Sequence, residues 1–401
     1  MRVVQINSTC GSGSTGKICL SISKLLTEQN VDNYILYSVG KSNYKFAMKY
    51  GSFLKQKIQA LFTRIFGNNG FAARGTTRKL ISFLKKINPD IVHLHNLHSN
   101  DINLPMLFDY LRNSNIKVFY TFHDCWAFTG YCTHFSFEGC DGYKNGCSKC
   151  PTRKKYSWFF DKSSILQRQK VSLIIRSNTT IITPSFWLAR IVEESFLKPL
   201  TIKTINNGID LSLFCYRESN FRENHAIPKE GKVLLGVSFG WGYKKGLDIF
   251  IRLSKELPSN YYIVLVGTNK NIDRLLPKNI ISIHKTDNAI EMAKIYSASD
   301  VFVNPTREDN FPTVNLESIA CGTPVVTFNA GGSGEMLDAY CGRVIPIDDY
   351  ESLKKEVINL CENHVIKRVD CINKAMQFDC SSKFKEYVNL YFETIGILKE
   401  M

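Results

Sequence analysis

Residues 300–335 have the sequence DVFVNPTREDNFPTVNLESIACGTPVVTFNAGGSGE, and this stretch decides the fold class. It opens with an apolar run at residues 301–303, which is typical of a strand buried on both faces of a parallel sheet. A helix is predicted at residues 313–321, because Gly322 suits the position after a helix and Pro324 cannot continue one. The stretch therefore predicts a strand–loop–helix–strand unit of an α/β protein.

The loop after the first strand predicts a ligand site. Ligands of open parallel sheets bind beyond the carboxyl ends of the strands. Glu308 and Asp309 lie at that end of the strand, and the helix that follows carries Glu317. The N-terminus of a helix attracts an anion such as a phosphate, and carboxylates beside it suit the hydroxyl groups of a sugar or ribose. These residues indicate a crevice for a nucleotide or a sugar.

The order of these residues resembles the E-x7-E signature of the GT4-type retaining glycosyltransferases, which have the GT-B fold. The resemblance is carried by DNFPTVNLE, ACGTPVV and GGSGE within residues 309–335. It implies that Asp309, or the adjacent Glu308, approaches the donor sugar and that Glu317 binds the ribose of the nucleotide. It also implies that the loop between them contacts the sugar and phosphates through Asn310, Phe311, Pro312 and Thr313. Without the flanking motifs, the acidic spacing would also fit a capped helix in any α/β protein.

Length and composition favour a folded protein of two domains. The chain has 401 residues, of which 44% are hydrophobic and 22% charged. No apolar run is long enough to span a bilayer, and the N-terminus has no signal-peptide pattern. Thirteen cysteines without a secretion signal favour reduced thiols. We therefore expect a cytoplasmic protein.

Alternating strand and helix patterns predict two doubly wound, Rossmann-like domains facing across a cleft. The predicted domains are an acceptor-binding domain at residues 1–207 and a nucleotide-sugar-binding domain at residues 208–380. Residues 208–231 are polar with few periodic apolar residues, and they are interpreted as a linker. The resemblance implies that a C-terminal helix at residues 381–401 packs back on the first domain, as is common in GT-B folds.

The positive charge lies in the first half of the chain. Residues 1–205 hold 28 Lys and Arg against 11 Asp and Glu, whereas the remaining residues hold 23 against 25. Residues 41–89 contain eleven basic and no acidic side chains, interleaved with Phe53, Leu54, Ile58, Leu61, Phe62, Ile65 and Phe66. This pattern predicts a basic amphipathic helix on the anionic lipid of the inner membrane. The alternative is a solvated helix with a stripe that faces the core. No nucleic-acid-binding module accompanies the charge, so nucleic acid is not an expected partner.

Two glycine-containing loops are candidates for phosphate contacts. Residues 11–17, GSGSTGK, almost form a Walker A loop, but Ile18 stands where the Mg²⁺-binding hydroxyl should be. The family has a Gly-rich turn here, so the resemblance implies that Gly13 lines the cleft; a purely structural turn is the alternative. Residues 240–248, GWGYKKGLD, resemble the family stretch whose Arg and Lys neutralise the pyrophosphate. Lys245 matches the Lys, whereas the Arg position is Gly240, so Lys244 or Arg307 is a candidate substitute.

Histidines complete the predicted cleft. His123 follows a predicted strand at residues 117–121 and matches a family His that contacts the transferred sugar; a core or surface His is the alternative. His95 ends another predicted strand and is interpreted as cleft lining without metal. The nucleotide base is predicted to pack near His284 and Thr286.

A cysteine-rich loop at residues 125–151 is the most individual feature of the chain. Cys132, Cys140, Cys147 and Cys150 have the spacing C-x7-C-x6-C-x2-C, which suits a structural tetrahedral Zn²⁺ site. Reduced packing cysteines and disulfides are the alternatives. Together with the preceding HDCWAFTGYC, the loop resembles a subgroup of capsular or colanic-acid-type glycosyltransferases.

The resemblance implies a retaining hexosyltransferase that needs no catalytic metal. It would move a sugar from a nucleotide-sugar donor to a hydroxyl of a growing, lipid-linked glycan in surface polysaccharide biosynthesis, as a peripheral protein on the cytoplasmic face of the membrane. One alternative is another GT-B enzyme: a nucleotide-sugar epimerase, or a phosphorylase, for which no pyridoxal Lys is evident. A second alternative is an inactive nucleotide-binding protein or membrane adaptor.

Overall fold

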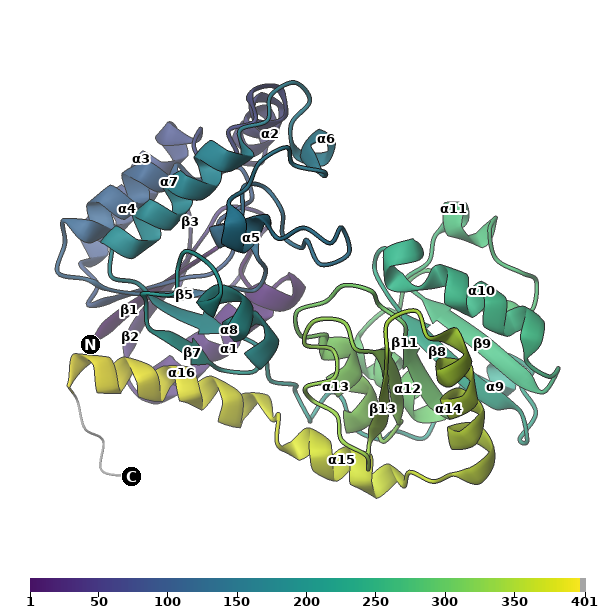
Figure 1. Ribbon diagram of the computed structural model, residues 1–401. Helices are drawn as coiled ribbons and strands as arrows, with labels where there is room; N and C mark the ends of the chain where they lie inside the picture. Colours follow the sequence, from purple (N-terminus) through teal and green to yellow (C-terminus); the bar gives the residue numbers. More distant parts are fainter. Residues whose placement is uncertain (397–401) are drawn as a thin grey trace. The chain divides into compact units, whose positions relative to one another are not determined.

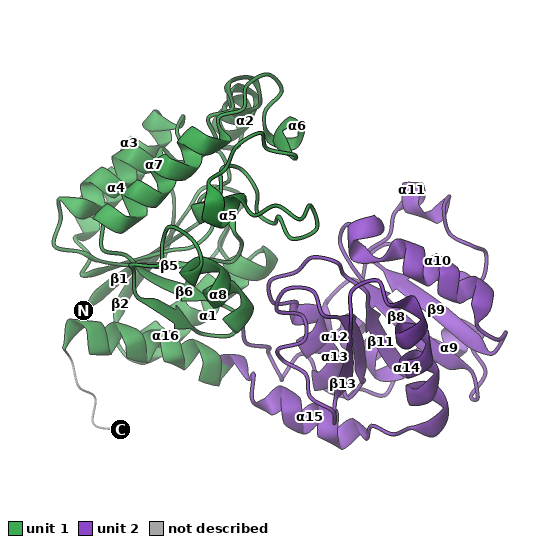
Figure 2. Cartoon of the chain, viewed as in Figure 1, with its two compact units in different colours: residues 1–206, 381–401 green, residues 207–380 purple. Residues whose placement is uncertain are grey.

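The computed structural model describes residues 1–396, which divide into two units with one parallel β-sheet each (Figure 1). Unit 1 comprises residues 1–206 and the chain from residue 381 on, and unit 2 comprises residues 207–380 (Figure 2). The sequence-based boundaries lie within one residue of these limits. Residues 397–401, the end of the predicted C-terminal helix, are outside the described residues.

Unit 1 is built on a seven-stranded sheet with the order β3-β2-β1-β4-β5-β6-β7. Its strands are β1 (Arg2–Asn7), β2 (Asp32–Tyr37), β3 (Ala47–Lys49), β4 (Ile91–Leu94), β5 (Lys117–Thr121), β6 (Thr180–Thr183) and β7 (Ile202–Thr204). Its helices are α1 (Gly13–Glu28), α2 (Phe53–Phe66), α3 (Arg74–Ile87), α4 (Leu104–Arg112), α5 (Gly142–Asn145), α6 (Arg153–Tyr156), α7 (Ser163–Arg176), α8 (Phe186–Glu193) and α16 (Cys380–Ile395). Val3, Val4 and Ile6 are fully buried, as expected for a parallel strand covered on both faces.

The C-terminal helix α16 packs on unit 1 (Figure 1). Tyr387 and Tyr391 of this helix are almost completely buried, and the Tyr391 ring lies 5.4 Å from the ring of Phe119 on β5. The Tyr391 hydroxyl also hydrogen-bonds the His93 imidazole on β4. Aromatic burial and this buried hydrogen bond therefore hold α16 against the sheet.

Unit 2 has six parallel strands in the order β10-β9-β8-β11-β12-β13. They are β8 (Lys232–Val237), β9 (Tyr261–Val266), β10 (Ile280–Ile283), β11 (Val301–Asn304), β12 (Val325–Phe328) and β13 (Gly342–Ile345). The helices are α9 (Phe221–Asn224), α10 (Leu247–Glu256), α11 (Lys270–Asp273), α12 (Ala289–Ala298), α13 (Thr313–Ala320), α14 (Tyr350–Asn363) and α15 (Arg368–Met376). The predicted strand–loop–helix–strand unit is β11, α13 and β12, whose strands pair in parallel.

The strand order of each unit reverses at one point. In unit 2 the chain runs from β8 outward to β9 and β10, and then returns to β11 on the other side of β8. In unit 1 the same reversal lies between β1 and β4. Loops after the two strands at such a point diverge and leave a crevice, which is where doubly wound sheets bind ligands.

Two sequence interpretations are wrong. Residues 208–231 are not a linker, because Ile209, Phe221 and Ile227 are buried in the core of unit 2. The apolar stripe of α2 does not face the core either, since Thr63 is the one buried residue of that helix. Among residues 1–396, no helix combines the length and hydropathy that a membrane crossing requires.

Candidate functional site

The loops after β8 and β11 meet at Lys245. Its ammonium nitrogen Nζ lies 2.8 Å from Asp309 Oδ2, 3.2 Å from Thr306 Oγ1 and 3.2 Å from the Glu308 carbonyl oxygen. The structure thus brings together Lys245 and Asp309, which the sequence assigned to the pyrophosphate and the donor sugar. The meeting point is the strand-order reversal of unit 2.

Glycine makes this approach of the two loops feasible. Gly246 has φ +71°, and a Cβ there would lie 2.4 Å from Pro305 Cγ. The backbone N–H of Arg307 donates to the Lys244 carbonyl oxygen at 2.9 Å. A side chain at position 246 would therefore separate the loops and move Lys245 away from Asp309.

A second glycine supports the acidic loop from β12. Gly331 has φ +62°, and a Cβ there would lie 1.8 Å from the Asp309 carbonyl oxygen. The N–H of Gly332 donates to the same oxygen at 3.3 Å. The Gly-Gly turn that carried part of the sequence resemblance thus positions the backbone of Asp309.

Arg307 does not serve as the missing phosphate cation. Its side chain is 3% exposed and forms a bidentate ion pair with Asp248 at 2.9 and 2.8 Å. It also pairs with Asp348 at 2.6 Å and lies 3.8 Å above the Tyr243 ring. Arg307 instead ties together the loops after β8, β11 and β13. The sequence did not reveal Asp248 and Asp348 as partners of Arg307, because they lie 59 and 41 residues away from it in the chain.

Lys244, the other proposed cation, pairs with Glu308. The distance from its Nζ to Glu308 Oε2 is 3.0 Å, and Glu308 is 8% exposed. The two candidate carboxylates therefore have different partners, Lys244 for Glu308 and Lys245 for Asp309. Asp309 is the more accessible of the two, with a side chain that is 25% exposed.

Glu317 lies half-buried on α13. Its Oε2 accepts a hydrogen bond from the hydroxyl of buried Tyr296 at 3.1 Å, which orients the carboxylate. On the same helix, buried Asn315 accepts from Asn304 and donates to the Ser333 carbonyl oxygen. These bonds fix α13 against β11 and the turn after β12, so the position of Glu317 is set by the fold.

The loop that enters α13 can contact a donor mainly through its backbone atoms. The Phe311 side chain is 5% exposed and packs against Phe378, so Phe311 can reach a donor through its main chain alone. Asn310 is also buried, Pro312 is the N-cap residue of α13, and Thr313 is its first residue. A helix N-terminus at this place is suited to an anion.

His284 and Thr286 lie apart from this cluster in the sheet. They follow β10, the edge strand, which is separated from β8 by β9. The His284 imidazole is 48% exposed and its Nε2 lies 2.6 Å from Asp273 Oδ2 on α11. The predicted base contact of these two residues stays a prediction.

In unit 1, Gly13 opens α1 after β1. It has φ +67°, and a Cβ there would meet nothing within 4 Å. The neighbouring Gly16 is closely packed, because its Cβ would lie 2.6 Å from Thr9 Oγ1. Gly13 is thus required for its backbone conformation and borders open space, which is compatible with the predicted contact to a ligand.

His123 follows β5 and is hydrogen-bonded to His95, which follows β4. Their atoms Nε2 and Nδ1 are 3.1 Å apart. Burial lowers the pKa of His123 to about 4, and burial also holds the pKa of His95 well below its usual range. Nearby His98 lies 2.9 Å from Asp124; burial would lower the pKa of His98, but this carboxylate outweighs burial and raises it. The imidazoles of His123 and His95 are therefore neutral, and the His98–Asp124 ion pair lies beside them.

The four cysteines of the predicted zinc site lie near one another in unit 1. The sulfur atoms of Cys132 and Cys150 each lie 3.4 Å from the Thr152 hydroxyl oxygen, and those of Cys140 and Cys147 flank Gly142. Within residues 1–396, no group of three or more His, Cys, Asp or Glu side chains is placed to hold a metal ion. The zinc site stays a prediction of the cysteine spacing.

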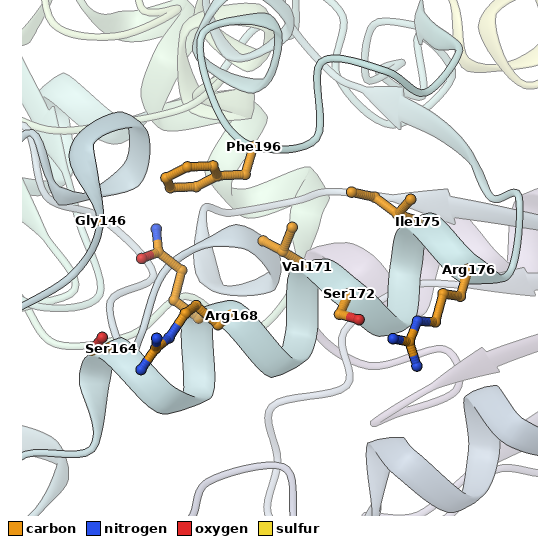
Figure 3. Close-up of a pocket in the computed structure, with 9 residues that line it drawn as sticks. Gly146, Ser164, Arg168, Val171, Ser172, Ile175, Arg176 and Phe196 are labelled. Atoms are coloured by element: carbon orange, nitrogen blue, oxygen red, sulfur yellow. The ribbon is translucent and has the colours of Figure 1, made fainter.

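A groove of about 460 Å³ runs along α7 in unit 1 (Figure 3). Val171 and Ile175 of α7 form its apolar floor, Phe196 lies opposite them, and Arg168 and Arg176 are also on α7. None of the predicted donor or catalytic residues lines this groove. We therefore do not place the chemistry there.

We expect the free energy of unfolding to fall as the pH is lowered from about 6.5 towards 4. Across this window unfolded His123 binds a proton that the folded, half-buried imidazole does not, so stability is lost as the pH falls. At one pKa unit per 1.36 kcal/mol, the loss from His123 is roughly 3 kcal/mol at pH 4.

Urea unfolding followed by tryptophan fluorescence at several pH values measures this loss. His123→Gln should give a shallower pH dependence than the wild type, whereas the exposed His364→Gln serves as the control and should not. An unchanged slope in His123→Gln would contradict the assignment of a neutral imidazole.

Comparisons with known proteins identify the family. The model described as Glycosyltransferase Family 4 matches residues 21–213, and the model described as Glycosyl transferases group 1 matches residues 218–378. The "Putative colanic acid biosynthesis glycosyl transferase WcaC" of Escherichia coli is 22% identical, over 98% of this chain and 99% of its own length.

Two further proteins are similar over part or all of the chain. The UDP-Gal:alpha-D-GlcNAc-diphosphoundecaprenol alpha-1,3-galactosyltransferase of Escherichia coli is 23% identical, over 51% of this chain and 57% of its own length. The structure of Anabaena HepE in complex with UDP-glucose aligns with a TM-score of 0.68 at 16% identity, covering 99% of this chain and 100% of HepE. The two matched family models, which together span most of the chain, and the two doubly wound sheets show that the chain belongs to the GT4-type glycosyltransferases of polysaccharide biosynthesis, with the GT-B fold.

Proposed function

We propose that the protein is a retaining glycosyltransferase that moves a sugar from a nucleotide-sugar donor to a hydroxyl of a growing, lipid-linked glycan. The observation that carries the proposal is the junction of Lys245 with Asp309 at the strand-order reversal of unit 2. The binding of UDP-glucose by HepE and the UDP-Gal in the name of the galactosyltransferase support a uridine diphosphate donor. The diphosphoundecaprenol in that name supports a lipid-linked acceptor.

Lys245 supplies the charge that the leaving group requires. Departure of a nucleoside diphosphate from the anomeric carbon places negative charge on its oxygen, and a positioned ammonium group stabilises that charge. The three N–H bonds of Lys245 are all used, by Thr306 Oγ1, Glu308 O and Asp309 Oδ2. A diphosphate that binds Lys245 must therefore replace one of these acceptors.

Of the three acceptors, Asp309 is the one that can give up its hydrogen bond to Lys245. The Glu308 carbonyl belongs to the backbone and the Thr306 hydroxyl is fully buried, whereas the Asp309 side chain is partly exposed and rotates without moving the loop. Donor binding would thus exchange the Asp309 carboxylate for the diphosphate on Lys245. The released carboxylate would then accept hydrogen bonds from hydroxyls of the donor sugar.

The remaining groups position the two ends of the donor. Glu317, oriented by Tyr296, would bind the ribose hydroxyls, and the N-terminus of α13 would face the phosphates. In unit 1, His123 would contact the transferred sugar. The proposed reaction proceeds by departure and attack on the same face of the sugar, through an oxocarbenium-like state, so the anomeric configuration is retained without a protein nucleophile.

Asp309→Asn separates the two roles of this carboxylate. We expect UDP to bind at least as tightly as in the wild type, because a competing anion has been removed from Lys245. Turnover should fall roughly 100-fold or more, because the sugar loses its carboxylate contact. Calorimetry with UDP and a transfer assay with a panel of nucleotide sugars measure the two effects.

Lys245→Ala should weaken both UDP binding and transfer, whereas Lys255→Ala on the exposed face of α10 should change neither. The anomeric configuration of the product, determined by NMR, tests retention. Wild-type protein that binds UDP but transfers no sugar would support the inactive alternative, and donor conversion without an acceptor would support the epimerase.

We further propose that α2 docks on an anionic membrane surface. Six apolar side chains of α2 are 42–69% exposed: Phe53, Leu54, Ile58, Leu61, Phe62 and Phe66. The backbone N–H of Trp158 donates to the Arg64 carbonyl at the end of α2, at 2.6 Å. This bond places exposed Trp158, Phe159 and Phe160 beside the helix.

Basic residues accompany this apolar surface. Lys55, Lys57 and Arg64 lie on α2, and Arg153, Lys154 and Lys155 form α6 just before the aromatic loop. Exposed aromatic and aliphatic side chains among basic residues fit the interface of an anionic bilayer, where each Lys or Arg contributes about 1 kcal/mol. A membrane surface is also where a lipid-linked acceptor would be found.

The triple variant Lys55→Gln, Lys57→Gln and Arg64→Gln should bind vesicles of phosphatidylglycerol about 100-fold more weakly, because roughly 3 kcal/mol of attraction is lost. Wild-type binding should weaken at high salt and be much lower on phosphatidylcholine. The matched control neutralises three exposed lysines of unit 2, at positions 229, 270 and 278, and should bind as the wild type does. Equal loss in both triple variants would contradict docking through α2.

A structural zinc at the cysteine loop stays a prediction of the sequence spacing. We expect elemental analysis of the purified protein to find one zinc per chain. Zinc-free protein that is as stable as protein supplied with zinc would overturn this prediction. Transfer in the presence of EDTA tests the separate expectation that catalysis needs no metal.

A further inference from the structure

The groove along α7 presents an apolar floor at the surface of unit 1 (Figure 3). Ile175 and Phe196, which lie on opposite sides of the groove, are 36% and 45% exposed, and Val171 between them is 8% exposed. Single exposed apolar side chains are common on protein surfaces, whereas several that gather in a concavity indicate a binding site.

The amide of Gln167, which also lines the groove, has no N–H left for an occupant. Its Nε2 donates to the carbonyl oxygens of Phe128 and Gly142 at 3.1 and 2.8 Å. Its Oε1 accepts from the backbone N–H of Cys147 at 2.6 Å. These bonds use both hydrogens of the amide, so the middle of the groove suits an occupant whose main body is apolar.

Arg168 and Arg176 add positive charge to this apolar surface. Both side chains are exposed, and neither guanidinium forms an ion pair or a hydrogen bond with another residue of the described range 1–396. Among the residues that line the groove, all of them within that range, none is acidic. The groove is therefore complementary to a molecule that is both apolar and anionic.

The two arginines lie at different ends of the groove. They are eight positions apart on α7, which corresponds to roughly 12 Å at the rise of an α-helix. Arg168 is next to Gln167, whose bond to Phe128 places this part of α7 beside the segment that follows β5, at the carboxyl edge of the sheet. Arg176 ends α7 four residues before β6 begins, at the opposite edge. An anionic group at Arg168 would thus lie at the carboxyl edge, with an apolar chain extending along the floor.

The size of the groove favours a chain molecule over a protein partner. Its volume of about 460 Å³ is in the range of sites for small ligands. Nine residues line it, whereas a stable protein–protein interface uses about 20–30 residues on each side. A lipid chain is the kind of apolar molecule that fits a narrow groove of this size.

We propose that the groove along α7 binds a prenyl diphosphate, with its diphosphate at Arg168 and its prenyl chain over Val171, Ile175 and Phe196. The aromatic loop at residues 158–160 leads directly into α7, so the Arg168 end of the groove adjoins the surface proposed to dock on the membrane. A lipid can enter the groove from there. That this lipid carries the acceptor glycan rests on the proposed function, whereas the binding of an apolar anion does not.

Calorimetry with farnesyl diphosphate tests the groove without a sugar donor or an acceptor glycan. The titration contains saturating UDP, so that a diphosphate site in unit 2 is occupied. We expect farnesyl diphosphate to bind at least about tenfold more tightly than farnesol or inorganic pyrophosphate, because each of these offers one half of the contact. Equal affinities for farnesyl diphosphate and pyrophosphate would overturn the proposal.

A matched pair of variants on α7 locates the prenyl chain. Ile175→Ser removes an apolar group from the floor of the groove, and Ile165→Ser removes one that is 49% exposed and does not line the groove. Both positions are at the surface, so neither change threatens folding. We expect farnesyl diphosphate to bind about tenfold more weakly to Ile175→Ser and normally to Ile165→Ser. Equal losses in the two variants would contradict binding in the groove.

Arginine variants locate the diphosphate. Arg168→Gln should weaken the binding of farnesyl diphosphate about tenfold and leave that of farnesol unchanged, because one charge-assisted contact is lost. Arg78→Gln, at an exposed position of α3, serves as the control and should bind both probes as the wild type does. A larger loss in Arg176→Gln than in Arg168→Gln would overturn the placement of the diphosphate.

Kinetics and sedimentation then connect the groove to the acceptor. The KM for a prenyl-diphosphate-linked glycan should rise about tenfold in Ile175→Ser and stay unchanged in Ile165→Ser. With the same glycan lacking the prenyl chain, the two variants should have equal KM values. Wild-type dimers that dissociate in Ile175→Ser would assign the groove to a second copy of the chain and overturn the lipid. If no sugar is transferred at all, the proposed function fails, while calorimetry still decides the groove.

Discussion

The close approach of two backbone loops at Lys245 is the constraint on which the donor half of this protein depends. The ammonium group holds the loop after β8 to the loop after β11, through one side-chain hydroxyl, one carbonyl oxygen and one carboxylate. Gly246 allows this approach and Gly331 lets the turn after β12 pack against the acidic loop, because any side chain at either position would overlap the neighbouring backbone. Buried Arg307 forms ion pairs with Asp248 and Asp348, and these pairs also hold the loops together. The backbone conformation at the glycines thus brings the loops close together, and the ion pairs then hold the acidic residues in place.

Unit 1 uses the same topology for a different chemical environment. At its strand-order reversal, neutral imidazoles lie next to buried amide and hydroxyl groups, and the single ion pair of His98 with Asp124 stands beside them. Neutral histidines can orient hydroxyl groups without introducing charge, whereas unit 2 presents the cation that a diphosphate requires. In the proposed function, unit 1 would contact the sugar and unit 2 would bind the diphosphate.

Local sequence patterns predicted much of the fold, and the predictions that were wrong have one cause in common. Continuous apolar runs predicted β11 and most other strands, and the Gly322–Pro324 signal ended α13 within one residue of its observed end. Residues 208–231 were misread because Ile209, Phe221 and Ile227 are too widely spaced to form a periodic pattern, although each is buried by distant segments. Arg307 was misread because the partners that occupy it lie 41 and 59 residues away. Local periodicity carries no information about such partners.

From residue type and short-range order, the sequence predicted the two-domain α/β class, the family, and Lys245, Asp309, Glu317 and His123 as candidate site residues. The tertiary structure shows how these groups are arranged. It pairs Asp309 with Lys245 and buries Arg307 with its two aspartate partners. The physical reason is that charge pairing depends on which groups lie within about 3 Å, and folding brings together groups that are far apart in the chain.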